Sequence, residues 1–161
     1  MRKTISGWLS FLALLCLSTA TFGQEARPAS KSQSLYLPVY SHMLYGNLGK
    51  SGKASQVLLS TLGSIRNTDA KRPLRITSAR YYDTHGKLLG ERIPNPVQLP
   101  PLGTMEVFVE LNDASGGSGA NFIIKWDAEA AINPPLVEGL HVNMDGGKAV
   151  IFMTQAVPVS E

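Results

Sequence analysis

Runs in which apolar and polar residues alternate account for most of the chain beyond its first fifth. The clearest run lies at residues 121–127, where Phe122, Ile124 and Trp126 share one phase and the residues between them share the other. A period of two is typical of a β-strand with one buried face. No stretch keeps the 3.6-residue period of an amphipathic helix. The pattern therefore predicts an all-β domain whose side chains alternate between core and solvent.

A second alternating run precedes the first, with Met105, Val107 and Val109 in one phase. Residues 113–121, which contain three glycines, link the two runs. Two alternating runs joined by a glycine-rich connection are the sequence form of a β-hairpin. We therefore expect the two runs to pair with each other, with Trp126 as an anchor of the core.

Further strands are expected where β-branched and aromatic residues lie between turn-forming residues. These strands are residues 35–45, 57–67, 74–83, 87–93, 97–99, 136–144 and 148–157. Pro38 cannot donate a ladder hydrogen bond, so the first of them is an edge strand or a strand start. A phase change between Ile76 and Ala79 predicts a bulge near Ser78, and Gly63 predicts a bulge or a close backbone approach.

The remaining connections also favour turns. Residues 127–132 favour one helical turn, which the prolines in residues 133–135 would end. Residues 145–147 (Asp-Gly-Gly) provide the positive-φ positions of a tight hairpin turn. Seven to nine short strands without an internal repeat predict an antiparallel β-sandwich of the immunoglobulin or fibronectin type III kind.

The first 23 residues have the pattern of a secretory signal peptide. Arg2 and Lys3 are followed by an apolar run at residues 8–17 and then by small residues. Cleavage is expected after Ala20 or Gly23, with Gly23 preferred. The apolar run is shorter than the roughly 20 residues that a spanning helix needs, so no membrane span is expected after cleavage.

The mature chain is expected to consist of a disordered lead-in at residues 24–34 and a single domain at residues 35–158. The lead-in is polar and rich in serine. The sole cysteine, Cys16, lies in the signal; Leu15 stands before it where a lipoprotein needs a small residue, which disfavours a lipid anchor. Without disulfides, the secreted or periplasmic domain must be held by its core.

Removing the signal brings the charge close to neutral. The chain has fifteen basic and twelve acidic residues; without Arg2 and Lys3, thirteen basic residues remain and the net charge is about +1. Nucleic acid is therefore not an expected partner.

Candidate chemistry is sparse. His42, His85 and His141 are not spaced as metal ligands and are expected to be separate surface residues, so neither a metal nor another cofactor is predicted. The sequence contains no Gly-x-Ser-x-Gly nucleophile elbow. The glycine-rich loop serves either as a connection or as a set of exposed amides that bind an anion.

The five tyrosines indicate either half-buried strand residues or a face that binds carbohydrate or peptide. The residues predicted to contact a ligand or partner are Tyr40, His42, Asp113, Ser115, Ser118 and Asn121. No residue is predicted to be catalytic.

Four segments resemble the bacterial family known as Domain of Unknown Function 3124. They are residues 37–42 (Leu-Pro-Val-Tyr-Ser-His), 64–69 (Ser-Ile-Arg-Asn-Thr-Asp), 81–87 (Tyr-Tyr-Asp-Thr-His-Gly-Lys) and 115–122 (Ser-Gly-Gly-Ser-Gly-Ala-Asn-Phe). The resemblance runs from about residue 35 to residue 152, and it implies a secreted or periplasmic β-sandwich. The family has no established activity, so the resemblance assigns no site residue.

The sequence thus favours a binding or scaffolding module of the bacterial envelope, whose partner is a protein, peptide or glycan. The alternative is an accessory hydrolase or ligand-processing enzyme with its site near residues 113–121.

Overall fold

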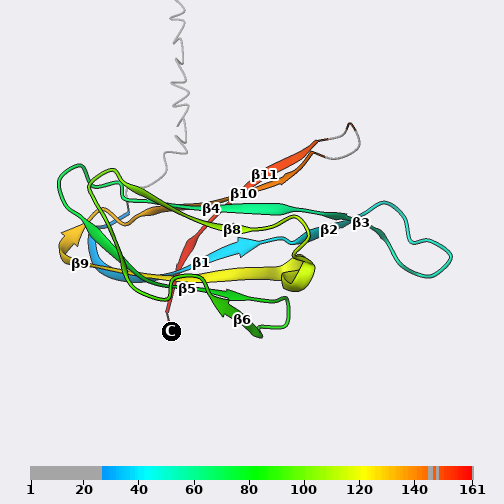
Figure 1. Ribbon diagram of the computed structural model, residues 1–161, viewed down its shortest axis with the longest axis horizontal. Helices are drawn as coiled ribbons and strands as arrows, with labels where there is room; N and C mark the ends of the chain where they lie inside the picture. The colour runs from blue at the N-terminus through cyan, green and yellow to red at the C-terminus, as the bar shows by residue number, and fades with distance from the viewer. Residues whose placement is uncertain (1–26, 145–146, 148, 161) are drawn as a thin grey trace, which may run out of the picture.

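The computed structural model describes residues 27–144, 147 and 149–160, which form a two-layered antiparallel β-sandwich (Figure 1). The predicted all-β sandwich is confirmed, while the predicted signal peptide lies outside the described residues. The strands are β1 (Ser30–Val39), β2 (His42–Tyr45), β3 (Ser55–Leu58), β4 (Ser60–Arg66), β5 (Leu74–Tyr82), β6 (Leu88–Glu91), β7 (Val97–Leu99), β8 (Thr104–Val109), β9 (Ala120–Ile132), β10 (Leu136–Asn143), β11 (Val150–Gln155) and β12 (Val157–Val159). One 3-10 segment, η1 (Ala114–Gly119), lies between β8 and β9.

The two layers differ in size. The six-stranded sheet has the order β12-β1-β9-β5-β6, and β7 pairs with β5 along the same edge as β6. The four-stranded sheet has the order β11-β10-β4-β8. β2 and β3 pair only with each other and form a separate hairpin, which we call the arm.

Three of the breaks between strands are one or two residues long. Residues 40–41 separate β1 from β2, Leu59 separates β3 from β4, and Ala156 separates β11 from β12. The twelve described strands therefore belong to nine extended runs, within the predicted range of seven to nine. Each break marks the point where the chain passes between a sheet and the arm or from one sheet to the other.

The predicted pairing of β8 with β9 is wrong. β8 pairs with β4 in the four-stranded sheet, and β9 lies between β1 and β5 in the other sheet. η1 carries the chain from one layer to the other at the end of the sandwich (Figure 1). Both strands direct an apolar phase into the same core, and alternation alone does not tell facing strands from paired ones.

The core lies between the layers, and its largest part comes from the six-stranded sheet. Phe122, Ile124 and Trp126 on β9 are buried as predicted, and Trp126 is only 1% exposed. Val107 and Val109 belong to the same cluster, so they face the β9 side chains across the layers. Trp126 is therefore a core residue, as the alternation predicts.

The predicted bulge of β5 is confirmed. Ile76 pairs with Trp126 and Ser78 pairs with Lys125, so Thr77 is an extra residue. Glu91 closes the bulge by accepting hydrogen bonds from the Ala79 amide (2.7 Å) and the Ser78 hydroxyl (2.6 Å).

Gly63 marks a close approach and not a bulge. β4 continues through it without a register shift, pairing with Gly139 on one side and Val107 on the other. A Cβ atom on Gly63 would lie 2.7 Å from Cγ2 of Val107. The position requires glycine because the neighbouring side chain occupies that space.

Two strands are longer than predicted. β1 begins at Ser30, so residues 30–34 of the predicted lead-in belong to the sheet. β12 covers β1 only from Ser34 to Tyr36, which leaves Pro38 at a locally free edge. β9 remains extended to Ile132, so the predicted helical turn is wrong.

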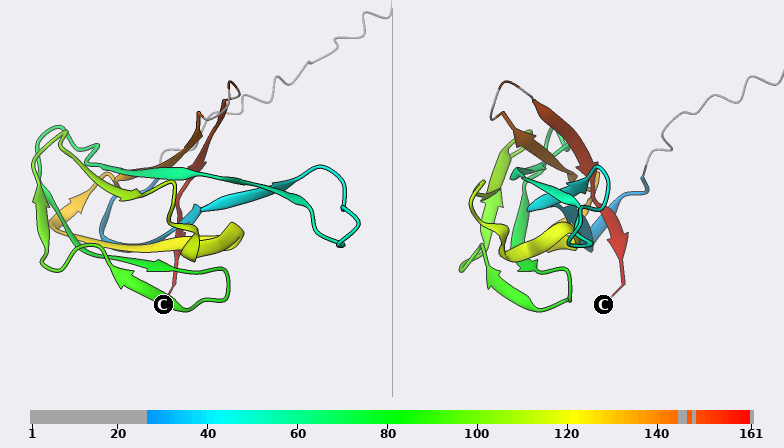
Figure 2. Two further views of the ribbon diagram at one scale, coloured as in Figure 1. Left: turned by 45° about the vertical axis from the view of Figure 1, so that its right-hand side comes forward. Right: turned by 90° about the vertical axis from the view of Figure 1, so that its right-hand side faces the viewer.

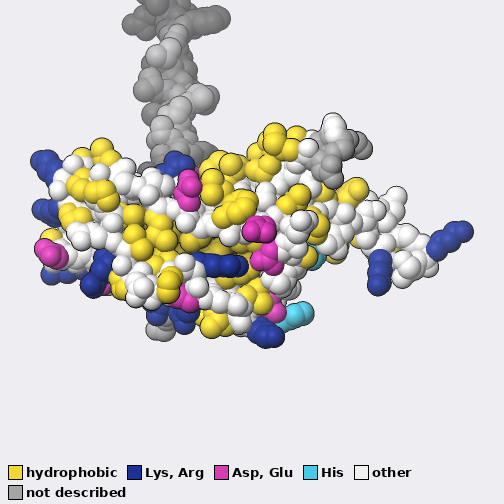
Figure 3. All heavy atoms as spheres, in the orientation of Figure 1, with side chains coloured by type: hydrophobic (Ala, Val, Ile, Leu, Met, Phe, Trp, Pro, Cys, Tyr) yellow, Lys and Arg dark blue, Asp and Glu magenta, His cyan; other side chains and the backbone are white. Residues whose placement is uncertain are grey.

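The arm extends beyond one end of the sandwich (Figures 1 and 2). His42 pairs with Leu58 and Tyr45 pairs with Ser55, and the connection between the strands contains Lys50 and Lys53. Figure 3 shows basic side chains at the outer end of the arm. In the part of the chain that the structure describes, no helix is long and apolar enough to cross a membrane.

Candidate functional site

The glycine-rich loop brings together two of the predicted contact residues, Asp113 and Ser115. One Asp113 carboxylate oxygen accepts hydrogen bonds from the Ser115 amide (3.1 Å) and from the Ser115 hydroxyl. The other carboxylate oxygen lies 3.6 Å from Nη2 of Arg92. The carboxylate therefore caps η1 and pairs with a cation of the chain itself.

Backbone hydrogen bonds tie the loop to both neighbouring connections. The Ser41 amide donates to the Gly117 carbonyl (3.0 Å), and the Thr84 amide donates to the Gly116 carbonyl (2.9 Å). The Gly119 amide donates to the Thr84 hydroxyl (2.9 Å). These contacts close the end of the sandwich, which gives the loop a structural role.

Gly116 is buried against the core, and its lack of a side chain permits this. A Cβ atom there would overlap the Tyr81 hydroxyl oxygen and would lie 2.8 Å from Oγ of Ser41. Those two hydroxyl groups share a hydrogen bond of 2.9 Å. The glycine thus allows the loop to pack directly on a buried polar pair.

The other predicted contact residues lie in different places. Ser118 is half-buried on η1, and Asn121 is on the outer face of β9, between Pro38 and Tyr82. His42 begins β2, and β2 packs against η1. Tyr40 is half-buried beside His141. The six residues therefore do not form one pocket.

The five tyrosines do not share a face either. Tyr81 is fully buried, whereas Tyr45 is exposed on the arm. Tyr36 and Tyr82 are half-buried on the outer face of the six-stranded sheet. The tyrosine-lined surface that the sequence suggests is thus divided among separate regions.

His141 is fully buried, which corrects its prediction as a surface residue. Its Nε2 accepts a hydrogen bond from the Tyr40 amide (3.1 Å), and its Nδ1 lies 3.1 Å from the Gly139 carbonyl oxygen. The ring stacks on Phe152 with centroids 4.5 Å apart. Burial lowers the pKa of His141, and the Tyr40 amide needs the neutral ring as an acceptor.

The inner face of the four-stranded sheet carries polar side chains because the backbone nearby leaves the ladders. Where β1 ends, Thr154 donates to the Pro38 carbonyl (2.8 Å) and His141 accepts from the Tyr40 amide. Asn143 donates to the Leu58 carbonyl (2.8 Å) at the base of the arm. Buried backbone groups need partners, and these side chains provide them.

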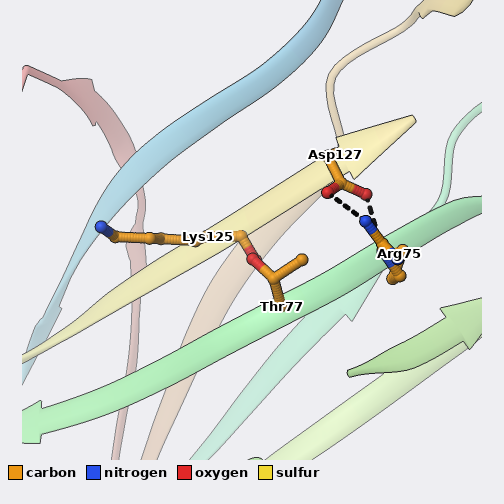
Figure 4. Close-up of polar contacts among 4 residues, drawn as sticks. All are labelled: Arg75, Thr77, Lys125 and Asp127. Atoms are coloured by element: carbon orange, nitrogen blue, oxygen red, sulfur yellow. Dashed lines mark hydrogen bonds and ion pairs between the residues drawn. The ribbon is translucent and has the colours of Figure 1, made fainter. Parts of the chain in front are cut away.

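A groove of about 570 Å³ lies where β5 and β9 diverge. Arg75 donates two hydrogen bonds to the Asp127 carboxylate, at 2.9 and 2.7 Å (Figure 4). Arg72 donates to the Ala131 carbonyl (2.8 Å). The arginines that line the groove thus bind groups of the chain itself, and the geometry gives no reason to place a ligand there.

The outer face of the four-stranded sheet carries an apolar row that crosses all four strands. Leu140 pairs with Met153 on one side and with Leu62 on the other, and Leu62 pairs with Phe108. Phe108 is 54% exposed and Met153 is 58% exposed. Ile151 extends the exposed apolar surface next to this row, and Figure 3 shows hydrophobic side chains on the β10–β11 hairpin.

Acidic residues flank the apolar row. Glu106 lies in the same phase of β8 as Phe108, Glu110 follows one residue after the strand ends, and both glutamates are exposed. Glu138 lies in the same phase of β10 as Leu140, with Nη1 of Arg66 3.7 Å from its carboxylate. The face therefore combines exposed apolar side chains with a net negative charge.

Sequence reasoning missed this surface, although two signals for it were present. Phe108 stands in the polar phase of its run, between two glutamates. In β10 the two phases compete, since Leu140 and Val142 alternate with His141 and Asn143. The structure buries the second phase and turns the leucine and the valine outward.

The comparisons agree with the motifs in the sequence. The family described as a protein of unknown function, DUF3124, has a model that matches residues 32–159. No curated protein matches the chain. A crystal structure of Thermotoga maritima 1070 is similar, with a TM-score of 0.45 and 9% identity over 80% of this chain and 95% of that one. The family match covers nearly all of the sandwich, and the chain belongs to the DUF3124 family.

Proposed function

We propose that this protein is an exported binding module of the bacterial envelope that holds a protein partner on the outer face of its four-stranded sheet. The observation that carries the proposal is the row of Phe108, Leu62, Leu140 and Met153, two of which are more than half exposed. Contiguous exposed apolar surface rimmed by polar residues is typical of protein–protein interaction sites.

The chemistry of the face defines the kind of partner. Burying a large apolar side chain stabilises a complex by about 1.5–3 kcal/mol, so the row gives the partner a reason to bind. Glu106 and Glu110 beside the row favour a partner with basic groups around an apolar centre. An acidic partner would be repelled.

The alternative of a hydrolase site near residues 113–121 has less support. Asp113 is held by Ser115 and Arg92, and the loop amides of Ser115 and Gly119 donate to groups of the chain. A hydrolase site needs a free carboxylate or exposed amides to act on the substrate. Here the Asp113 carboxylate and the Ser115 and Gly119 amides are already engaged within the chain.

Export is the second part of the proposal, and it rests on the signal pattern at residues 1–23. The intact mass of the protein recovered from the envelope should correspond to a chain that begins near Gln24. A chain that keeps Met1 and remains in the cytoplasm would contradict export.

Photo-crosslinking in the native cells tests the binding face. A photoreactive phenylalanine at Phe108 should give a discrete crosslinked species, and so should one at Met153. The matched control is Tyr36, an aromatic residue on the outer face of the other sheet. The species should be lost when Glu106 and Glu110 are both changed to Lys. Equal crosslinking at Tyr36 and Phe108, or none at Phe108 and Met153, would overturn the proposal.

A further inference from the structure

The arm has a composition unlike that of the rest of the surface. Leu44, Tyr45 and Leu48 are all more than half exposed, and Leu48 is 71% exposed. Lys50 and Lys53 lie near its tip, and the chain has no acidic residue between Glu25 and Asp69. The arm is therefore apolar and basic.

An isolated two-stranded hairpin is at best marginally stable in water, because it has no third strand and no layer to cover its faces. The arm pairs with neither sheet; β2 packs against η1, and Asn143 of β10 donates to the Leu58 carbonyl at the base of the arm. Its exposed leucines and tyrosine are the side chains that a covering surface would bury. The arm thus needs a partner as much as the apolar row does.

We propose that the arm of one copy of this protein lies on the outer face of the four-stranded sheet of a second copy. This inference rests on the proposed function, since it names the occupant of the same face. Lys50 and Lys53 are basic, whereas Glu106 and Glu110 beside the row are acidic. Opposite charges flanking two apolar surfaces fix their register and favour the contact.

The two surfaces also agree in size. A strand of four residues, the length of β2, spans about 13 Å at roughly 3.3 Å per residue. A row that crosses four strands spans three gaps of about 4.8 Å each, or about 14 Å. One arm therefore extends across the whole apolar row.

The arm does not reach the face of its own copy. Leu59 alone separates β3 from β4, so the arm continues along the strand direction of its own four-stranded sheet (Figures 1 and 2). It points away from the sandwich and does not fold back over it. A contact between two such faces is also disfavoured, because it would bring Glu106 and Glu110 of both copies together.

Disulfide trapping tests this contact cleanly, because the exported chain has no cysteine of its own once Cys16 is removed with the signal. Leu48→Cys and Phe108→Cys variants of the exported chain are purified separately, mixed and exposed to oxidised glutathione. We expect a disulfide-linked dimer in the mixture and little in either variant alone. Leu88→Cys, an exposed residue on β6, replaces Phe108→Cys in the control mixture and should give little dimer.

Charge reversal provides the second part of the test. Adding Lys50→Glu and Lys53→Glu to the Leu48→Cys chain should abolish the dimer. Adding Glu106→Lys and Glu110→Lys to the Phe108→Cys partner should restore it. Equal yields with Leu88→Cys, or a failure of the second pair of changes to restore the dimer, would overturn the inference.

The outcomes separate this inference from the proposed function. If the mixture gives no specific dimer while Phe108 still crosslinks a different protein in cells, the second copy is ruled out and the binding face remains. If Phe108 crosslinks nothing in cells, both proposals fail.

Discussion

The two sheets of the sandwich use their faces in different ways. In the six-stranded sheet the buried face is apolar, with Phe122, Ile124 and Trp126 at its centre. In the four-stranded sheet, buried Thr61, His141 and Asn143 occupy part of the inner face, while Phe108, Met153 and Ile151 are exposed on the outer face. A sheet that only had to stabilise the fold would place these residues the other way round.

The difference shows that one sheet provides most of the core, whereas the other combines polar side chains on its inner face with exposed apolar side chains on its outer face. Its inner polar side chains hold the backbone where β1 and the arm leave the ladders, as the bonds from Thr154 and Asn143 show. Its outer apolar row is then available for a partner. The following substitutions test this division, from the largest expected effect to the smallest.

Trp126→Ala should lower the free energy of unfolding by about 3–5 kcal/mol, because it removes a buried aromatic side chain from the core sheet. That is a large part of the roughly 5–15 kcal/mol that stabilises a domain. Glu129→Ala, exposed on the same strand, should change it by about 0.5 kcal/mol or less. Urea denaturation measures both. A stable Trp126→Ala protein would mean that the core is not centred on β9.

Gly116→Ala should lower the free energy of unfolding by about 1–3 kcal/mol, since the new methyl group would collide with the Tyr81 hydroxyl. Gly90→Ala is the control, because a Cβ atom there has no neighbour within 4 Å. Thermal unfolding of the two variants compares them directly. Equal melting temperatures would show that the loop does not pack as described.

His141→Leu should lower the free energy of unfolding by about 1–3 kcal/mol, because it leaves the buried Tyr40 amide without its acceptor. His85→Leu, in an exposed turn, should change it by about 0.5 kcal/mol or less. Urea denaturation at pH 7.5 is the appropriate measurement. An unaffected His141→Leu protein would remove the argument that inner polar side chains hold the backbone.

The same histidine predicts a pH dependence. The pKa of His141 is lowered by burial from its ordinary 6.5, so near that pH the unfolded chain binds more protons than the folded one. Its contribution to stability is therefore complete above pH 6.5 and is lost as the pH falls towards the folded pKa. Hydrogen bonds from the Lys71 and Lys87 amides lower the pKa of Asp69 and Asp83, whose contributions are lost only below their ordinary 3.8.

Unfolding midpoints measured from pH 7.5 to 5 test the predicted loss of stability as the pH falls. The wild-type chain should lose stability over this interval, and a His141→Gln chain, whose side chain does not titrate, should lose less. A parallel decline in both proteins would show that the histidine is not the titrating group.

Phe108→Ser should have the smallest effect on folding, about 1 kcal/mol or less, because more than half of the side chain is already exposed. Phe108→Ser should nevertheless strongly reduce the crosslinking in cells from a photoreactive phenylalanine at Met153. Val107→Ser, one residue away and buried, is the matched contrast and should destabilise the fold. If Phe108→Ser destabilises the fold as much as Val107→Ser does, the row belongs to the core.

Much of the six-stranded sheet could be predicted from the sequence, because its strands carry a single apolar phase. In β5 the phase changes between Ile76 and Ala79, which predicted a bulge near Ser78, and the structure has the extra residue at Thr77. The pairing of β8 could not be predicted, since its inward valines are equally compatible with a neighbouring strand and with a facing one. The 3-10 segment between β8 and β9 carries the chain to the other sheet, so the two strands face each other and do not pair. Its glycines resemble those of a hairpin loop, so the sequence does not distinguish the two arrangements.

The outward position of Leu140 in the apolar row and the burial of His141 were missed for one physical reason. In β10 the apolar phase of Leu140 and Val142 competes with the phase of His141, and hydrophobicity alone favours burying the leucine. What reverses the choice is a backbone amide at Tyr40, 101 residues away in sequence, that needs an acceptor. The sequence around β10 shows that the two phases compete, but it carries no local signal of this long-range hydrogen bond, which decides between them.

The most direct test of the central claim is the rate at which a Met153→Cys chain is alkylated by a soluble maleimide. In dilute purified protein the thiol should react quickly, because residue 153 is 58% exposed. In the native envelope it should react much more slowly, while Leu88→Cys reacts at similar rates in both settings. Equal rates at residue 153 in both settings would show that nothing covers the face, and slow reaction in the purified chain would show that the apolar row is not exposed.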